Sequence, residues 1–383
     1  MHKTGSTSIQ EVLAKNECGK EFTYLNLGDL NHNHRIFSLF SDNPSKYYLN
    51  RGKSSDEIEK FNKQTVELLV CCVKNLETPK AIISGEDLIN LNEKELSKMK
   101  IFFETYFTLI TVFAYVREPT SYINSLFQQI IKSGIGFERF MYENSDENVE
   151  VLNLNMLYPQ YKKLFVKHEK VFGVKNIKLK LFDKNSLIKS NVVADFISTF
   201  NLQINANKII TSNEGIAKPS LSILYVLRKA SFNGVADFSP QLLTKISNNL
   251  LKIQGEKLTL SDNAYEKVLG DNDGDVEWLE KKLSQRLPKS TRNRGSVFTE
   301  HDLIKISEDE FKEFTQLLKD VSLEERFKNQ IIDIVREVCL HGNLEKISEK
   351  ENANNHFNIL DKKVKPSFEP ADILREVAYA FER

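Results

Sequence analysis

A run near the start of the chain combines a lysine, a glycine and several hydroxyl side chains: Lys3, Thr4, Gly5, Ser6, Thr7 and Ser8. Apolar residues at Ile9 and Leu13 follow it with helical spacing, so the run leads into an amphipathic helix. Glycine lets the backbone approach an anion closely, the N–H groups of a helix start point toward that anion, and Lys3 adds positive charge. The order differs from a Walker A loop, in which the lysine follows a second glycine. The run predicts either a phosphate-binding loop or an ordinary helix capped by serine or threonine.

A second group of polar residues follows the most apolar segment of the chain. Residues 109–116 read Leu-Ile-Thr-Val-Phe-Ala-Tyr-Val, which predicts a buried strand, and Arg117 comes directly after it. Pro119 suits the first position of a helix, and Ser125 falls on the face of that helix opposite its apolar stripe. A guanidinium and a hydroxyl suit a phosphate monoester bound where parallel strands end. The alternative is an arginine paired with a surface carboxylate.

Strand and helix patterns alternate along the first part of the chain. The strand patterns lie at 22–27, 81–84, 109–116 and 177–182, and the main helical patterns at 6–15, 55–76, 92–103, 119–131 and 187–200. This alternation predicts an α/β fold in which a central parallel sheet is the middle layer of three, with helices on both faces. From 221 to 287 we expect mostly helices.

Together, the two polar segments resemble sulfotransferases that use 3′-phosphoadenosine 5′-phosphosulfate (PAPS). The 5′-phosphosulfate loop of that family reads Lys-(Ser/Thr)-Gly-(Ser/Thr)-(Ser/Thr), as Lys3 to Thr7 do here. Its 3′-phosphate motif has an arginine at a strand end and a serine eight residues later, as Arg117 and Ser125 are placed here. Softer similarity to bacterial sulfotransferase-like proteins continues at 182–183, 193–200, 213–214 and 272–279. The resemblance covers roughly 1–287 and implies the P-loop-like fold of this family.

The resemblance implies an enzyme that moves a sulfuryl group from PAPS to a hydroxyl or amine of a glycan or small acceptor, leaving adenosine 3′,5′-bisphosphate. Lys3 would contact the 5′-phosphate and the bridging oxygen, and the residues from Thr4 to Ser8 would hold the 5′-phosphate. Arg117 and Ser125 would hold the 3′-phosphate, which distinguishes this nucleotide from an ordinary adenine nucleotide. The chemistry implies no metal.

The acceptor needs a general base, for which a carboxylate and two histidines are candidates. Glu86 follows the strand 81–84 in Ser-Gly-Glu, which looks like a segment of bacterial relatives; it would face the cofactor cleft or else stabilise a helix start. His32 and His34 lie at a predicted helix start and are either bases or polar surface residues. We take Glu86 and His34, with Lys3, as the candidate catalytic residues. Aromatic residues near these motifs are expected to pack: Tyr115, Tyr122 and Trp278.

The same patterns suggest a domain of 1–287, a polar linker of 288–300 and a helical C-terminal extension of 301–383. Amphipathic helices are predicted in the extension near 308–321, 323–340 and 371–381. Such helices pack on their own domain or form a homo-oligomer or partner surface. In the family a buried strand precedes the phosphosulfate loop, so we expect this first strand to be missing before residue 1, in a native protein that is longer, with its neighbours lacking a ladder partner.

Composition excludes several classes of function. The chain has 383 residues with 53 basic and 53 acidic side chains, which argues against a nucleic-acid or polybasic membrane binder. No segment reaches the roughly 20 apolar residues of a membrane helix. The four cysteines show no Cys-x-x-Cys spacing, and a reduced cytoplasmic setting is expected. A catalytically weak or silent nucleotide-binding relative with an assembly role is the alternative function, and the absent Walker lysine disfavours a kinase.

Overall fold

The computed structural model describes residues 5–15, 18–143, 152–204, 216–288, 295–348 and 377–382. Its strands are β1 (Phe22–Tyr24), β2 (Lys80–Gly85), β3 (Leu109–Val116), β4 (Ile177–Leu181) and β5 (Val377–Glu382). Up to residue 204, the helices are α1 (Ser6–Lys15), α2 (Asn33–Phe40), α3 (Ser55–Lys74), α4 (Glu93–Glu104), α5 (Pro119–Ser133), α6 (Phe137–Glu143), α7 (Tyr161–Phe172) and α8 (Val192–Thr199). The later helices are α9 (Lys218–Phe232), α10 (Pro240–Leu250), α11 (Asp262–Gly270), α12 (Asp273–Leu283), α13 (Glu300–Ile304), α14 (Glu308–Lys319) and α15 (Glu325–Val335).

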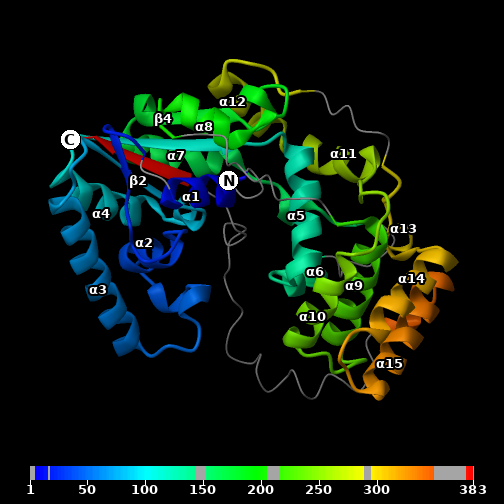
Figure 1. The fold of residues 1–383 in the computed structure, drawn as a ribbon. Helices are drawn as coiled ribbons and strands as arrows, with labels where there is room; N and C mark the ends of the chain where they lie inside the picture. The colour runs from blue at the N-terminus through cyan, green and yellow to red at the C-terminus, as the bar shows by residue number, and fades with distance from the viewer. Residues whose placement is uncertain are drawn as a thin grey trace.

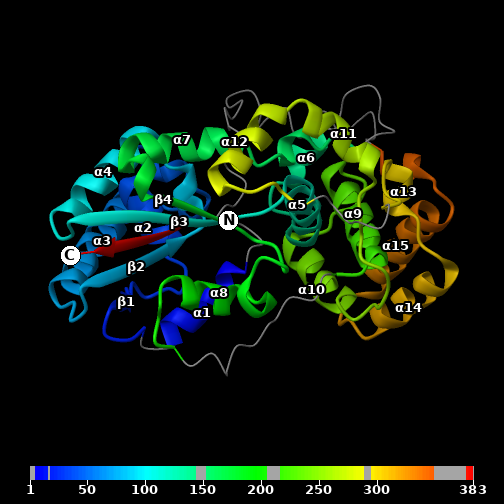
Figure 2. The ribbon, with the colours of Figure 1, turned by 90° about the horizontal axis from the view of Figure 1, so that it is seen from above.

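The sheet has the strand order β1-β2-β5-β3-β4. β1 pairs with β2 and β3 with β4 in parallel, whereas β5 is antiparallel to both of its neighbours. Four strands, β1 to β4, therefore run in the same direction, as expected for a parallel sheet. The central strand, β5, runs in the opposite direction, so the sheet is mixed. Figure 2 shows this strand in red between β2 and β3. The class is α/β.

The predicted helix near 371–381 is wrong for Val377–Glu382, which form β5. Residues 371–376 lie outside the described part of the chain. The segment reads Val-Ala-Tyr-Ala-Phe-Glu, and β-branched and aromatic residues favour strands. Within it, Ala380 pairs with Ile82 of β2 on one side and with Thr111 of β3 on the other. The backbone of β5 thus satisfies polar backbone groups of two buried strands, and no local pattern in the sequence reveals this pairing. The expected lack of a ladder partner is not observed, because β2 and β3 each pair with β5.

Helices cover both faces of the sheet, which gives three layers (Figure 2). On one face, α1 and α8 contribute Ile9, Leu13 and Phe196 to an apolar cluster with Ile82 and Phe113 of the sheet. On the other face, α4 and α7 belong to the main core. Members of that core from these helices and the sheet are Leu96, Met99, Phe165, Ile83 and Val112.

The later helices form a second body around α9, on the right of Figure 1. Arg228 of α9 donates hydrogen bonds to the carbonyl oxygens of Ile131 and Lys132 near the end of α5. Lys229 forms a buried ion pair of 2.5 Å with Glu300, the first residue of α13. The predicted helices near 308–321 and 323–340 are confirmed as α14 and α15, the latter continued by a π-helical turn (Arg336–Leu340).

The predicted linker borders this second body. Residues 289–294 lie outside the described residues, and the part from Gly295 onward is packed: Val297 is buried and bridges to Leu260, while the Thr299 side chain caps α13. A single apolar cluster runs from Leu25 in the sheet domain to Ile347 beyond α15. The helices on both sides of residue 288 therefore share one core.

Candidate functional site

The predicted phosphate loop begins the first described helix. Lys3 and Thr4 lie outside the described residues, and Gly5 adopts φ +77°, a left-handed conformation that favours glycine. A Cβ at Gly5 would lie 2.5 Å from Cγ1 of Val192, so the backbone here touches its neighbour too closely for any side chain. Ser6 and Ser8 are half-buried and Thr7 is exposed. The first turn of α1 carries no acidic residue, which leaves the positive end of the helix dipole suited to an anion.

A buried hydrogen bond fixes α1 to the end of β2. Gln10 lies on the second turn of α1, and its Nε2 donates to Oγ of Ser84 at 3.1 Å. Both side chains are buried, and Ile9 and Leu13 on the same helix are buried against the sheet. The start of α1 is therefore positioned at the edge where β2 ends.

Arg117 stands at the same edge, directly after β3. Its guanidinium lies over the ring of Phe182, 5.6 Å from Cζ to the ring centroid, in cation–π geometry. The N–H of Phe182 donates to the carbonyl oxygen of Val116 at 2.7 Å, and the Tyr161 hydroxyl donates to the carbonyl oxygen of Arg117. The Phe182 ring also lies beside Gly5, because its Cε2 is 3.9 Å from where a Gly5 Cβ would be. The structure thus brings the glycine of one predicted motif and the arginine of the other to a single aromatic ring.

The helix after Arg117 begins as predicted. Pro119 is its first residue, and the Glu118 carboxylate accepts hydrogen bonds from the N–H groups of Thr120 and Ser121 at 2.9 and 2.8 Å. The Glu118 side chain therefore caps the N-terminus of α5. Ser125 lies in the second turn and is half-buried, while the apolar face of α5 packs into the core. Arg117 thus lies two residues before α5, and Ser125 lies in the second turn of that helix.

Glu86 is the candidate base closest to this edge of the sheet. It follows β2 directly and is 8% exposed. It directly precedes the short 3₁₀ helix Asp87–Asn90, and its side chain makes no cap hydrogen bond to that helix. Glu86 therefore lies at a helix start, and its two expected roles, as a base or as a carboxylate that stabilises this helix start, both stay predictions. The neighbouring Asp87 accepts a hydrogen bond of 2.5 Å from the Tyr47 hydroxyl. The turn that carries Glu86 is thus held by contacts of its neighbour.

His34 is placed by the packing of α2 against α3. Its Nε2 lies 2.7 Å from Oδ1 of Asn50 and 3.2 Å from Nζ of Lys53, and its ring stacks on Phe61 at 4.3 Å. Burial, together with the nearby Lys53 charge, lowers the pKa of His34. These contacts hold the ring against Phe61 of α3 and against Asn50 and Lys53 of the segment that precedes α3.

His32, the other histidine of the pair, is completely buried and bonded to the end of β2. Its Nδ1 accepts from the N–H of Ser84 at 3.2 Å, and its ring stacks on Tyr24 at 4.6 Å. Burial lowers the pKa of His32 to about 3, so the ring is neutral. The hydrogen bond from Gln10 to the Ser84 hydroxyl and the one from the Ser84 N–H to His32 together connect α1, the end of β2 and His32. These hydrogen bonds support the turn that carries Glu86.

The three aromatic residues expected to pack are confirmed in that role. Tyr115 and Tyr122 are buried, and the Tyr115 hydroxyl donates to the buried Asp195 at 2.6 Å. Trp278 packs against the main core and stacks with Phe165. Sequence reasoning missed the role of Phe182, which it noted only as part of a Phe-Asp dipeptide. No local pattern identifies a ring shared by two segments so far apart.

Searches against protein-family models, curated proteins and solved structures find no match to this chain. Among the described residues, none of the helices combines the length and apolarity needed to cross a membrane. The same residues contain no cluster of three or more histidine, cysteine or carboxylate side chains that could hold a metal ion. Gly5, Phe182 and Arg117 lie together at the edge of the sheet where β2 and β3 end.

Proposed function

We propose that this protein is a PAPS-dependent sulfotransferase with the P-loop-like fold of that family, acting on a hydroxyl or amine of a glycan or small acceptor. The observation that carries the proposal is the common placement of Gly5 and Arg117 against Phe182. A nucleotide with phosphates at both ends of its ribose needs two cationic or N–H-rich sites a short distance apart. The start of α1 and the guanidinium of Arg117 supply two such sites on one edge of the sheet.

The donor set fits this nucleotide. The left-handed glycine and the uncharged first turn of α1 suit the 5′-phosphate, with Lys3 adding charge at the oxygen that bridges phosphorus and sulfur. Arg117, with the Ser125 hydroxyl, suits the 3′-phosphate. The Glu118 carboxylate is occupied by the cap of α5, which reduces its repulsion of a bound phosphate. When bound, PAPS supplies an activated sulfuryl group.

The residues of the chain then have separate tasks in transfer. The bond between sulfur and the bridging oxygen breaks, a bond from sulfur to the acceptor oxygen or nitrogen forms, and the acceptor proton passes to a base. Glu86 is the preferred base, because it is buried and directly follows β2 at the edge where β3 and β4 also end. His34 is the second choice, since its imidazole already contacts Asn50 and Lys53.

A transfer assay tests the function. Labelled sulfate in PAPS is offered with a panel of bacterial glycans and small hydroxylated acceptors, and Arg117→Ala is compared with Arg51→Ala, an exposed arginine used as the matched control. Loss of a hydrogen bond to a charged group costs about 1.5–3 kcal/mol, so Arg117→Ala should bind nucleotide roughly tenfold or more weakly while remaining folded. Tight binding of adenosine 3′,5′-bisphosphate without transfer to any acceptor would favour the silent relative instead.

A further inference from the structure

Asp195 of α8 is a buried carboxylate that ties this helix to two strands of the sheet. Its side chain is fully buried and accepts hydrogen bonds from the Tyr115 hydroxyl of β3 at 2.6 Å and from Nζ of Lys180 of β4 at 2.9 Å. It also accepts from the N–H of Ile188, in the segment before α8, at 3.1 Å. Burial raises the pKa of Asp195, but the hydrogen bonds from Lys180 and Tyr115 outweigh this effect and keep the pKa below its ordinary value. A charged carboxylate therefore holds α8 to β3 and β4 at once.

The two side chains that hold Asp195 lie next to the proposed nucleotide site. Tyr115 and Lys180 are direct partners in the parallel pairing of β3 and β4. Arg117 and Phe182 follow them by two residues, each directly after its strand, and residues two apart in a strand point to the same face of a sheet. The rings of Tyr115 and Phe182 meet edge to face, with centroids 6.5 Å apart. Asp195 is thus anchored one repeat of the sheet below the ring over which the Arg117 guanidinium lies.

The same helix contacts the predicted phosphate loop. Val192, the first residue of α8, lies one helical turn before Asp195 and therefore on the same side of the helix. Its Cγ1 is only 2.5 Å from the place that a Cβ of Gly5 would take, and α1 and α8 lie side by side on this face of the sheet (Figure 2). Gln10 anchors α1 to β2 further along that helix. The contact with Val192 is therefore the one that places Gly5.

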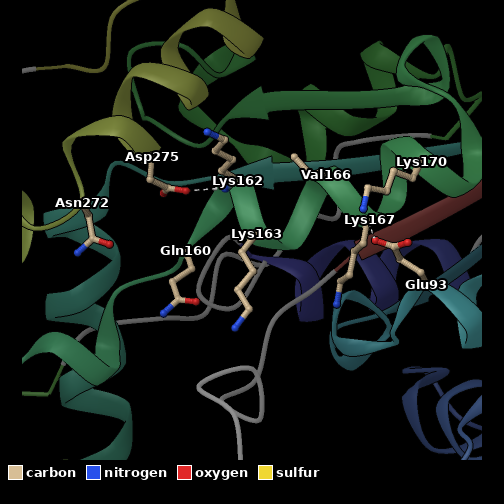
Figure 3. Close-up of a pocket in the computed structure, with 9 residues that line it drawn as sticks. All are labelled: Glu93, Gln160, Lys162, Lys163, Val166, Lys167, Lys170, Asn272 and Asp275. Atoms are coloured by element: carbon tan, nitrogen blue, oxygen red, sulfur yellow. Dashed lines mark hydrogen bonds and ion pairs between the residues drawn. The ribbon is translucent and has the colours of Figure 1, made fainter.

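Arg117 is held from the other face of the sheet, by contacts that do not involve α8. The Tyr161 hydroxyl of α7 donates to the carbonyl oxygen of Arg117. Asp275, near the start of α12, accepts from the N–H groups of Tyr161 and Lys162 at 3.0 and 2.6 Å, which fixes the start of α7 (Figure 3). A movement of α8 would thus displace Gly5 while the backbone of Arg117 stays in place.

We propose that Asp195 is a positioning residue for the nucleotide. Through α8 it sets the separation between the start of α1, assigned to the 5′-phosphate, and Arg117, assigned to the 3′-phosphate; this inference rests on the proposed sulfotransferase function. A ligand with both phosphates gains from the second site only if the separation matches its own, because the second phosphate then binds in an intramolecular step. Asp195 is fully buried and belongs to neither phosphate site, so its effect should appear only with a ligand that spans both.

Nucleotide titrations of three proteins test this role. The ligands are adenosine 3′,5′-bisphosphate, adenosine 5′-monophosphate and adenosine 3′-monophosphate, and the test variant is Asp195→Asn. The matched control is Glu300→Gln in the second body. Glu300 is likewise a buried carboxylate between a tyrosine and a lysine, Tyr225 at 2.9 Å and Lys229 at 2.5 Å. We expect Asp195→Asn to bind the bisphosphate about tenfold more weakly and each monophosphate with unchanged affinity, and the control to match wild type with all three ligands.

The pattern across the three ligands separates positioning from general support of the fold, because a loss of structure would weaken all of them. Unchanged bisphosphate affinity in Asp195→Asn, an equal loss for all three nucleotides, or an equal loss in Glu300→Gln would overturn the proposal. If circular dichroism shows that Asp195→Asn does not fold, Tyr115→Phe takes its place with the same pattern expected, since it removes one hydrogen bond to Asp195 and keeps the ring. A wild-type protein that binds the bisphosphate no more tightly than the monophosphates would instead refute the proposed function, and the role of Asp195 with it.

Discussion

Replacing Gly5 by alanine is the most direct way to disturb the proposed phosphate loop without changing its charge. Two penalties apply at this position. The backbone has φ +77°, and the added Cβ would lie 2.5 Å from Cγ1 of Val192, which is half-buried at the start of α8. A left-handed conformation costs an alanine roughly 1–2 kcal/mol, and overpacking adds about 1–3 kcal/mol. We therefore expect Gly5→Ala to lower the free energy of unfolding by about 2–5 kcal/mol.

Gly136 separates the two penalties, because it also has φ +77° but a Cβ there would meet nothing within 4 Å. Gly136→Ala should cost only the conformational part, about 1–2 kcal/mol. In a Val192→Ala background the close contact at Gly5 is removed, since the remaining Cβ of residue 192 lies 3.6 Å away. In that background, Gly5→Ala should lower the free energy of unfolding by no more than Gly136→Ala does. The difference between the cost of Gly5→Ala with Val192 and with Ala at position 192 is the coupling energy of the contact.

Urea unfolding of the four variants, with m-values compared, gives these free energies. Titration with adenosine 3′,5′-bisphosphate gives the functional effect, for which we expect at least about a tenfold loss of affinity in Gly5→Ala and none in Gly136→Ala. The reasoning is refuted if Gly5→Ala is no more destabilising than Gly136→Ala, or if Val192→Ala does not reduce its cost.

Three other predictions address the base, the central strand and the buried histidine. Glu86→Gln should lower the rate of transfer by about 10²–10⁴-fold while nucleotide affinity measured by calorimetry stays unchanged. Ala380→Pro should destabilise the protein by about 1–3 kcal/mol or more in urea unfolding, because Ala380 pairs with both Ile82 and Thr111 and proline removes its N–H. His32 has a pKa of about 3 in the fold against 6.5 as its ordinary value, so the unfolded chain takes up the proton first as pH falls. Stability should decrease from about pH 6.5 downward by about 1.4 kcal/mol per pH unit for this group, measured as unfolding free energy between about pH 7 and pH 5.

Each of these predictions has a contrasting outcome. Full activity of Glu86→Gln would move the base to His34 or another residue. Ala380→Gly should cost only about 0.5–1 kcal/mol, and equal effects of glycine and proline would show that β5 does not hold β2 and β3 together. A pH dependence that is the same in His32→Asn as in wild type would assign the slope to other groups, of which His168, with a pKa of about 3, is the first candidate.

Local sequence patterns predict a helix or strand well where the residues of that segment alone determine its conformation. The apolar segment 109–116 forms β3 with the same boundaries, and the i, i+3, i+4 stripe after Pro119 forms the buried face of α5. Both predictions depend only on the burial of apolar residues within one segment, and not on the identity of the elements that pack against it. The positions of Arg117 and Ser125 relative to their elements follow in turn, since a strand end and a helix face are properties of the element alone.

Pairing between distant segments is what the sequence did not reveal. Val377–Glu382 has apolar spacing compatible with a helix, and its strand conformation depends on the unpaired edges of β2 and β3, which are far away in the chain. The Phe182 ring acquires its role from Gly5 and Arg117, and His34 is held by Asn50 and Phe61 on elements that follow it. In each case tertiary contacts decide the outcome.

Calorimetric titration with adenosine 3′,5′-bisphosphate and with ATP tests the central claim most directly. We assign Arg117 and Ser125 to the 3′-phosphate, which ATP lacks. We therefore expect tight binding of the bisphosphate and binding of ATP weaker by at least about tenfold, a difference that Arg117→Ala removes. At about 100 times its dissociation constant the bisphosphate should stabilise the fold by roughly 2.7 kcal/mol. Equal affinity for the two nucleotides, or a preference that persists in Arg117→Ala, would contradict the account.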